Sequence, residues 1–196
     1  YKRTIQTVIY LPHFISWVIV ISLTYLFFSS EIGFINKIIE SFGGERIRFL
    51  FINEYFYPFI MLQDLWRNVG WGSIIYMAAI AGVNPNLYEA AKIDGAGKLK
   101  QIWHVTIPSI MPTIIILFIL QLGGTLDVNF EQLYLMQNPS NTHLSEVFET
   151  YIFKVGVGGA EYSYTTAIGI FKSVVGLVLV LLANYWANKK GHEGLW

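Results

Sequence analysis

The hydrophobic positions of this chain fall into four long stretches separated by more polar segments. They cover residues 8–28, 56–82, 107–123 and 166–187. A helix that crosses the hydrocarbon core of a bilayer needs about 20 predominantly apolar residues. A buried core helix of a soluble protein could explain one such stretch, but four of them within 196 residues favour a membrane. The pattern therefore predicts an all-α chain with four membrane-spanning helices.

The composition of the chain agrees with a lipid-facing surface. Hydrophobic residues make up 54% of it and charged residues 13%, whereas soluble domains carry roughly 25% charged residues. Ionisable side chains are costly in hydrocarbon, which explains the deficit. The net charge of zero gives no indication of a nucleic-acid partner. The chain begins at a tyrosine, and we expect it to be part of a longer protein.

The distribution of Lys and Arg predicts the orientation, because basic residues collect in cytoplasmic loops. If each stretch crosses the membrane once, seven basic residues fall on one side and four on the other. The seven are Lys2, Arg3, Lys92, Lys98, Lys100, Lys189 and Lys190. We therefore expect residues 84–106 and the C-terminus to be cytoplasmic. Residues 29–55 and 124–165 should lie on the outer side.

The predicted cytoplasmic loop contains a short helix with a face of small residues. Asn86 is placed to cap this helix, with Glu89 three residues later as in a capping box. At helical spacing, one face then carries Leu87, Ala90, Ala91 and Asp94. Small residues permit close approach between helices. An exposed helix with such a face suits insertion into a cleft of another protein.

The residues after this helix are rich in glycine. Gly95 and Gly97 should end the helix, a second short helix should cover about residues 98–105, and Pro108 should open the next spanning helix. The run from Gly95 to Lys98 superficially suggests a phosphate-binding loop. Such a loop has a Ser or Thr directly after its Lys, whereas Leu99 stands there. We therefore expect no ATP hydrolysis and no catalytic residues in this chain.

The same loop resembles the signature of permease subunits of binding-protein-dependent ABC importers. That signature reads Glu-Ala-Ala, three residues, Gly, nine residues, Ile, one residue, Leu-Pro. At the same spacing this chain has Glu89-Ala90-Ala91, Gly95, Val105 and Ile107-Pro108. Val replaces Ile and Ile replaces Leu, and both changes keep the apolar character. Asp94-Gly95-Ala96 also matches the form that is common in carbohydrate importers.

Further segments are similar to permeases for polysaccharides or complex oligosaccharides. They are Tyr10–Trp17, Trp66–Tyr76, Phe130-Glu131-Gln132 and Tyr162–Lys172. The resemblance implies an all-α, polytopic membrane helical bundle of the type I importer permease (MetI-like) kind, with a short cytoplasmic coupling helix. Such permeases usually have six spanning helices, so we expect two to lie outside this chain. The residues 1–196 would then form one transmembrane permease domain.

The resemblance also implies partners and roles. The chain would bind no cofactor, and two partner ATP-binding subunits would hold ATP and Mg²⁺. Other partners would be a second homologous permease subunit, a solute-binding protein, the carbohydrate and the lipid bilayer, with no nucleic acid. The location would be the bacterial cytoplasmic membrane, crossed several times. The residues expected to couple to the ATPase are Glu89, Ala90, Ala91, Asp94, Gly95 and Pro108.

Polar residues within or beside the apolar stretches are candidates for the substrate pathway. Asp64 and Arg67 are three residues apart and therefore neighbours on one helix face. Such a pair lines a cavity or neutralises itself inside the bundle, and the sequence leaves both open. Further candidates are Gln121, Asp127, Asn129 and Lys172. The histidines at 13, 104, 143 and 192 show no metal-ligand spacing.

Two alternatives remain at this point. One is an importer permease for a solute that is not a sugar. The other is a secondary transporter, which would bind a coupling ion at broken helices near the midplane. The chain lacks an evident charged proton relay, and the signature in residues 84–108 argues for an ATPase partner. Both observations disfavour the secondary transporter.

Overall fold

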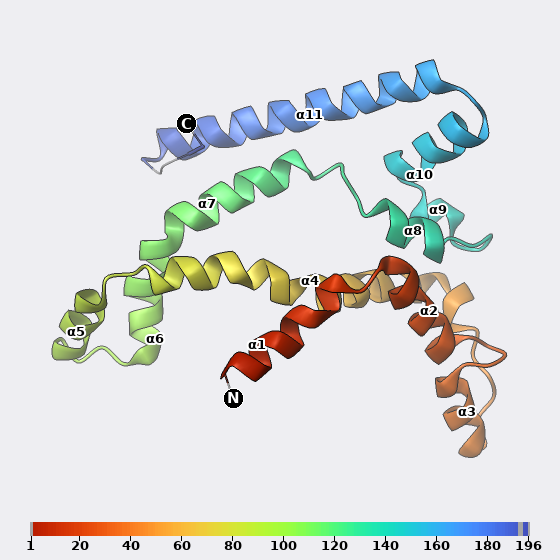
Figure 1. Cartoon of the computed structure of the whole chain (residues 1–196), viewed down its shortest axis with the longest axis horizontal. Coiled ribbons are helices and arrows are strands. Elements are labelled where there is room, and N and C mark those ends of the chain that lie inside the picture. The colour runs from red at the N-terminus through yellow and green to blue at the C-terminus, as the bar shows by residue number, and fades with distance from the viewer. Residues whose placement is uncertain (1, 192–193, 196) are drawn as a thin grey trace. The chain divides into compact units, whose positions relative to one another are not determined.

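The computed structural model describes residues 2–191 and 194–195, and all their regular secondary structure is helical. Of the residues discussed above, His192 lies outside the described part, as do the side chains of Lys2 and Arg3. The chain forms two compact units. The first contains the chain as far as Trp71 together with Asp127–Ile168, and the second contains Gly72–Leu126 and the chain from Gly169 on. Figure 1 shows the order of the helices.

The first unit opens with a broken helix. Helix α1 (Lys2–Tyr10) runs into a 3-10 turn (Leu11–Phe14), and α2 (Trp17–Phe28) follows at 95° to it. Pro12 lies in the turn, and Ser16 is extended at ψ 152° and caps α2 by accepting from Ile19 N. The prediction of one continuous helix over 8–28 is therefore wrong. The local cause is Ser16, which acts as an N-cap in the middle of the apolar stretch and thereby starts a new helix.

Helix α4 (Asn53–Ala81) holds this break through Arg67. The Nε of Arg67 donates to Ile15 O at 2.9 Å, which is one of the carbonyls exposed by the break. The guanidinium carbon lies 4.6 Å from the centre of the Trp17 ring. Arg67 thus satisfies a bare helix-end carbonyl and stacks on an aromatic face.

One turn further along α4, His13 and two α4 side chains add a second contact. The His13 ring stacks on Trp71 with 4.5 Å between centroids and 2° between planes. Its Nδ1 lies 3.1 Å from Asn68 Oδ1. Asn68 Nδ2 in turn donates to Asp64 Oδ1 at 2.7 Å. Positions 64, 67, 68 and 71 lie on one face of α4, so that face contacts the break over two turns.

Gly70 permits the close approach of α1 to α4. A Cβ at Gly70 would overlap the backbone oxygen of Ile9, whereas a Cβ at Gly72 would meet nothing within 4 Å. We expect Gly70→Ala to destabilise the protein by about 1–3 kcal/mol because the backbone must shift. Gly72→Ala is the matched control and should be neutral or slightly stabilising. Thermal unfolding of the purified protein in detergent compares the two, and equal midpoints would contradict the close contact.

The rest of the first unit consists of short helices on the predicted outer side. They are α3 (Phe34–Ser41), a 3-10 turn (Phe49–Phe51), α8 (Phe130–Met136), α9 (Thr142–Ser145), α10 (Phe148–Ile152) and a π-helical turn (Phe153–Gly158). The 3-10 turn and α8 pack with α2 and α4 in a core of Trp17, Val20, Ile21, Leu50, Phe56, Leu133 and Met136, and Leu144 of α9 packs against it. This core fixes α8 against α2, and α8 carries part of the site described below.

The segment between α2 and α4 is tied down by polar contacts. The buried Asn36 donates to Ser29 O and Ile47 O and accepts from Ile47 N, at 2.8–3.0 Å. Arg46 forms a two-point ion pair with Glu40, and the hydrogen bond from its guanidinium lowers the pKa of the Glu40 carboxyl. These contacts give the segment a defined conformation although it contains few regular elements.

The second unit contains the end of α4, α5 (Pro85–Ile93), α6 (Lys98–Gln101), a π-helical turn (Ile102–Thr106), α7 (Ile107–Gly123) and most of α11 (Tyr162–Lys189). Two glycines bring α7 and α11 together. A Cβ at Gly176 would lie 2.6 Å from Gly123 O, and one at Gly123 would lie 2.7 Å from a Val180 methyl. Small residues at a helix crossing are typical of packing within membranes.

Two helices of the described residues are long and apolar enough to span a membrane, Lys98–Gly123 and Tyr162–Lys189. The broken pair α1–α2 gives a third if it crosses as one span. These three correspond to the predicted stretches 107–123, 166–187 and 8–28. Helix α4 covers the stretch 56–82 in length, but Gln63, Asp64, Arg67 and Asn68 lower its hydropathy. The all-α fold is confirmed, and the count of four spans stays a prediction.

Candidate functional site

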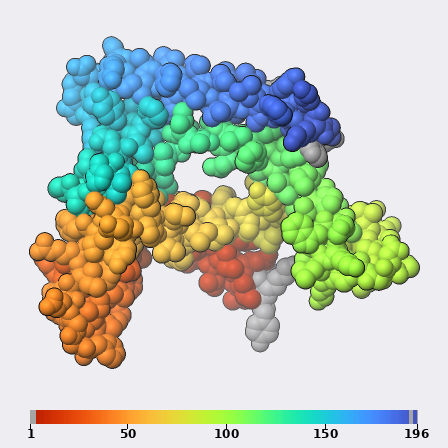
Figure 2. Space-filling model, turned by 180° about the vertical axis from the view of Figure 1, so that it is seen from behind, coloured from red at the N-terminus to blue at the C-terminus, as the bar shows by residue number. Residues whose placement is uncertain are grey.

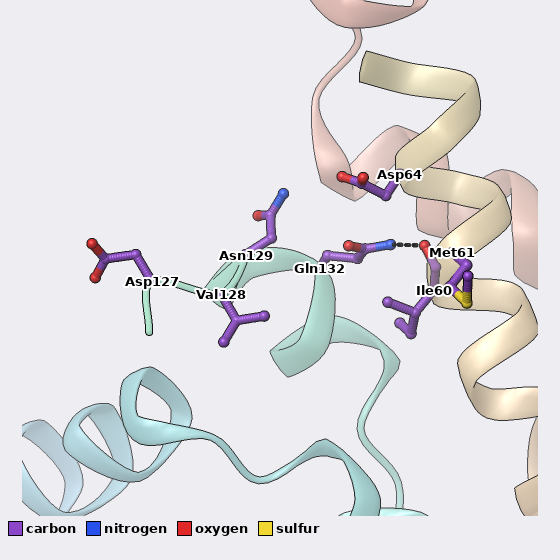
Figure 3. Close-up of a pocket in the computed structure, with 7 residues that line it drawn as sticks. All are labelled: Ile60, Met61, Asp64, Asp127, Val128, Asn129 and Gln132. Carbon is purple, nitrogen blue, oxygen red and sulfur yellow. Dashed lines mark hydrogen bonds between the residues drawn. The ribbon is translucent and has the colours of Figure 1, made fainter. Parts of the chain in front are cut away.

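A pocket of about 520 Å³ opens between α4 and the start of α8 in the first unit. Its volume falls in the range of small-molecule sites, roughly 300–1,000 Å³. The lining residues are Ile60, Met61, Asp64, Asp127, Val128, Asn129 and Gln132. Figure 3 shows Asp64, Asn129 and Gln132 gathered around one region, while the carboxylate of Asp127 points away from the other three. The pocket thus combines three apolar side chains with a few polar groups.

Gln132 is 2% exposed, and its amide nitrogen is fully used inside the protein. Its Nε2 donates to Ile60 O at 2.9 Å and to Gln63 Oε1 at 3.0 Å. The opposite end of the amide, the carbonyl oxygen, lies on the pocket side (Figure 3). Gln132 therefore presents a hydrogen-bond acceptor to the pocket.

Three of the six residues predicted for the substrate pathway line this pocket, namely Asp64, Asp127 and Asn129. Arg67 instead binds Ile15 O, so the structure does not pair it with Asp64. Gln121 and Lys172 belong to the second unit. Contact of any of these residues with a substrate stays a prediction.

Gln132 was missed as a site residue, although a signal was available. It follows Asn129 by three positions, and residues at this spacing share a helix face once a helix starts at Phe130. Gln132 also stands beside Leu133, on a helix face that is otherwise apolar, and this position indicates a buried side chain. The decisive information is tertiary, because Gln132 is oriented by residues of α4.

The second candidate element is the loop between α4 and α7. The N-cap of helix α5 lies two residues earlier than predicted. Asn84 is the N-cap and accepts from Asn86 N at 3.0 Å, and Pro85 occupies the first helical position. The prediction that Asn86 caps the helix with Glu89 in a capping box is therefore wrong. Proline is favoured at the first position because its missing N–H has no partner there anyway. Glu89 is exposed and free of a capping role.

The end of α5 is a complete Schellman turn. Gly95 has φ +74°, its N–H donates to Lys92 O at 3.1 Å, and Ala96 N donates to Ala91 O at 2.8 Å. Gly97 has φ −67° and caps α6 instead of ending α5. Of the two glycines predicted to end the helix, only Gly95 does so. The left-handed conformation makes glycine the residue suited to this position.

The two short helices form a lobe that Figure 2 shows at the surface in yellow-green and green. The hydroxyls of Tyr88 and Thr106 share a hydrogen bond of 2.9 Å that ties α5 to the π-helical turn. Glu89 and Ala90 are exposed, and Ala91 is half-buried. Several large apolar side chains of the lobe are also exposed, namely Leu87, Ile93, Leu99, Ile102 and Trp103. Such a surface is typical of an interaction site.

Comparison with known proteins identifies the family to which the chain belongs. Residues 1–191 match the sequence model of the family described as "Binding-protein-dependent transport system inner membrane component". The chain belongs to this family. The resemblance noted from the Glu89–Pro108 signature is thereby confirmed, and the chain is a membrane component of a transport system rather than an ATPase.

Several members of the permease family are close in sequence. The chain is 50% identical over 196 residues to the polygalacturonan/rhamnogalacturonan transport system permease protein YteP of Bacillus subtilis. It is also 50% identical over 195 residues to protein LplB of the same organism. Each match covers 100% of this chain and 61% of the relative. The chain thus spans about three fifths of the length of these relatives.

Solved structures of the family share the fold. A bacterial alginate ABC transporter, crystallised with its alginate pentasaccharide-bound periplasmic protein, matches with a TM-score of 0.92 and 41% identity. That match covers 100% of this chain and 68% of the other. A second structure of an alginate importer matches with a TM-score of 0.90 and 42% identity over 96% of this chain. The permease fold of this family is therefore shown for the chain.

Proposed function

We propose that this chain forms the core of a permease subunit of an ATP-driven carbohydrate importer. The proposal rests on the α5–α6 lobe, an exposed apolar helix pair whose sequence carries the Glu89–Pro108 signature. The lobe would dock into a cleft on an ATP-binding subunit through Glu89, Ala90, Ala91, Asp94 and Gly95, and Pro108 would start the helix behind it. ATP and Mg²⁺ would be held by two such subunits.

The substrate pathway would lie in the membrane between this chain and a second permease. Four spans, α1–α2, α4, α7 and α11, would contribute from this chain. A solute-binding protein would deliver the sugar from the outer side, and the permease pair would open alternately outward and inward. Asp64, Asn129 and Gln132 would meet the substrate in the pocket beside α8. The names of the relatives, which refer to polygalacturonan, rhamnogalacturonan and alginate, support a glycan as the substrate.

The test is uptake by the assembled transporter. The full-length subunit, the ATP-binding subunits, the second permease and the binding protein would be reconstituted in vesicles with labelled glycan fragments. We expect uptake only with ATP inside and binding protein outside. Uptake driven by an ion gradient without ATP would favour a secondary transporter. ATP-dependent uptake of a solute other than a sugar would favour an importer permease for a non-sugar solute.

Orientation gives a separate prediction. The chain contains no cysteine, so single cysteines can be placed without a background signal. Lys98→Cys on the lobe and Glu131→Cys on α8 are both exposed positions. In intact cells, an impermeant thiol reagent should label position 131 and not position 98, because the distribution of basic residues favours a cytoplasmic lobe. Labelling of position 98 alone would reverse the proposed topology.

A further inference from the structure

The pocket is lined by groups that accept hydrogen bonds, and their orientation is set by a chain of bonds through the first unit. The Thr24 hydroxyl donates to Val20 O at 3.1 Å, so its oxygen is left to accept from Gln63 Nε2 at 2.8 Å. Gln63 Oε1 then accepts from Gln132 Nε2. Each amide has one donor end and one acceptor end. The helix carbonyls of Val20 and Ile60 therefore force the acceptor end of Gln132 toward the pocket.

A second chain fixes Asp64. Asn68 Nδ2 donates to Asp64 Oδ1, so Asn68 Oδ1 is left to accept from His13 Nδ1. Asp64 is exposed and receives only part of its bonding capacity from Asn68, because a carboxylate can accept about four hydrogen bonds. The Asp64 side chain lines the pocket and lies near Asn129 and Gln132 (Figure 3). Two independent networks thus deliver acceptors to the same space.

We propose that this pocket is a subsite for an uncharged, hydroxyl-bearing sugar ring. Two hydroxyls of the ring donate to Asp64 and to Gln132 Oε1, and Asn129 bonds a third group with its amide. Ile60, Met61 and Val128 cover the apolar face of the ring. This inference rests on the proposed function and assigns a substrate class to its site.

The charges at the pocket exclude the carboxylate of a uronate ring from this subsite. Among the described residues that line the pocket, none is Lys or Arg. A uronate here would meet the Asp64 carboxylate and the Gln132 carbonyl oxygen without a donor of positive charge. Like charges at short range repel each other. A glycan that mixes neutral and acidic rings would therefore place a neutral ring here.

The experiment measures selectivity in the complete reconstituted transporter. Initial uptake rates over a range of concentrations give kcat/KM for two fragments of equal length, one containing neutral rings and one made only of uronates. The variants are Asp64→Asn and Gln132→Met, with Glu54→Gln as the control. Glu54 is an exposed acid on the same helix outside the pocket. Co-purification with the ATP-binding subunits confirms that each variant folds.

We expect the wild type and Glu54→Gln to prefer the fragment with neutral rings. In Asp64→Asn the ratio of the two kcat/KM values should fall about 10- to 100-fold, the effect of one hydrogen bond to a charged group. Gln132→Met should lower the same ratio, and EDTA should leave it unchanged. An unchanged ratio in an assembled Asp64→Asn transporter would overturn the subsite.

Uronate uptake that requires both Ca²⁺ and Asp64 would also overturn it, because the site would then hold a cation. If the assembled wild type takes up neither fragment with ATP, the proposed function itself fails.

Discussion

Replacing Gly95 by valine is expected to abolish substrate-stimulated ATP hydrolysis by the assembled transporter while membrane insertion stays normal. Gly95 has φ +74° at the end of α5. A residue with a Cβ costs about 1–2 kcal/mol in the left-handed region, and a β-branched residue is a true outlier there. The Schellman turn would open, and the direction of the chain between α5 and α6 would change. Because the site lies outside the predicted spans, the helices of the membrane should still form.

Gly97→Val is the matched control. Gly97 has φ −67° and open space around its Cα, so a side chain fits there without strain. A second variant, Ala90→Trp, adds bulk on the exposed face without touching the turn, and overfilling a packed groove costs about 1–3 kcal/mol. We expect both Gly95→Val and Ala90→Trp to lose coupling and Gly97→Val to keep most of it. Insertion, co-purification and ATP hydrolysis are measured together. Normal hydrolysis in Gly95→Val would rule out the lobe as the coupling element.

Replacing Arg67 by alanine should give the largest loss of stability. Arg67 bonds the exposed carbonyl of Ile15 and stacks on Trp17. A hydrogen bond from a charged group contributes about 1.5–3 kcal/mol, and a cation–π contact adds about 0.5–1 kcal/mol or more. We therefore expect Arg67→Ala to destabilise the protein by about 2–4 kcal/mol. Arg67→Lys should recover only part of this, because an ammonium lacks the planar stacking surface.

Thermal unfolding of the purified subunit, followed by tryptophan fluorescence, tests this expectation. The matched control is Arg48→Ala, which removes an exposed arginine from the segment between α2 and α4. Surface changes of that kind usually stay within about 0.5 kcal/mol. A midpoint for Arg67→Ala equal to that of Arg48→Ala would show that the break between α1 and α2 does not depend on Arg67.

Periodicity and length predicted the helical fold, and the stretch 107–123 coincides with α7 because glycine and proline mark its ends. The break at residues 15–16 could not be read from the chain alone. Pro12 looked like the first turn of a longer helix, and prolines do lie within α4 and α7, at Pro58 and Pro112. Two features separate this break from those prolines: Ser16 caps a new helix, and Arg67 binds the carbonyl that the break exposes.

The sequence likewise does not reveal tertiary partners at the pocket, and this explains which of the predicted pathway residues line it. Asp64, Asp127 and Asn129 stood out because polar groups beside apolar stretches need a reason to be there. Arg67 stood out equally, yet it serves the helix break. The sequence shows that a charge must be satisfied and does not show by which partner. Gln132 acquires its role only through Gln63 and Thr24, which are far from it along the chain.

The bond chain from Val20 to Gln132 has a consequence for how such a permease can evolve. The amide ends of Gln63 and Gln132 point as they do because Thr24 offers an acceptor at the start of the chain. A change at Thr24, a residue buried under α4 and absent from the pocket lining, would release Gln63 to turn. Gln132 would then lose one of its two acceptors, and its amide would be held by Ile60 O alone. One mutation at a remote position would thereby loosen the acceptor that Gln132 presents to the sugar without altering the pocket wall.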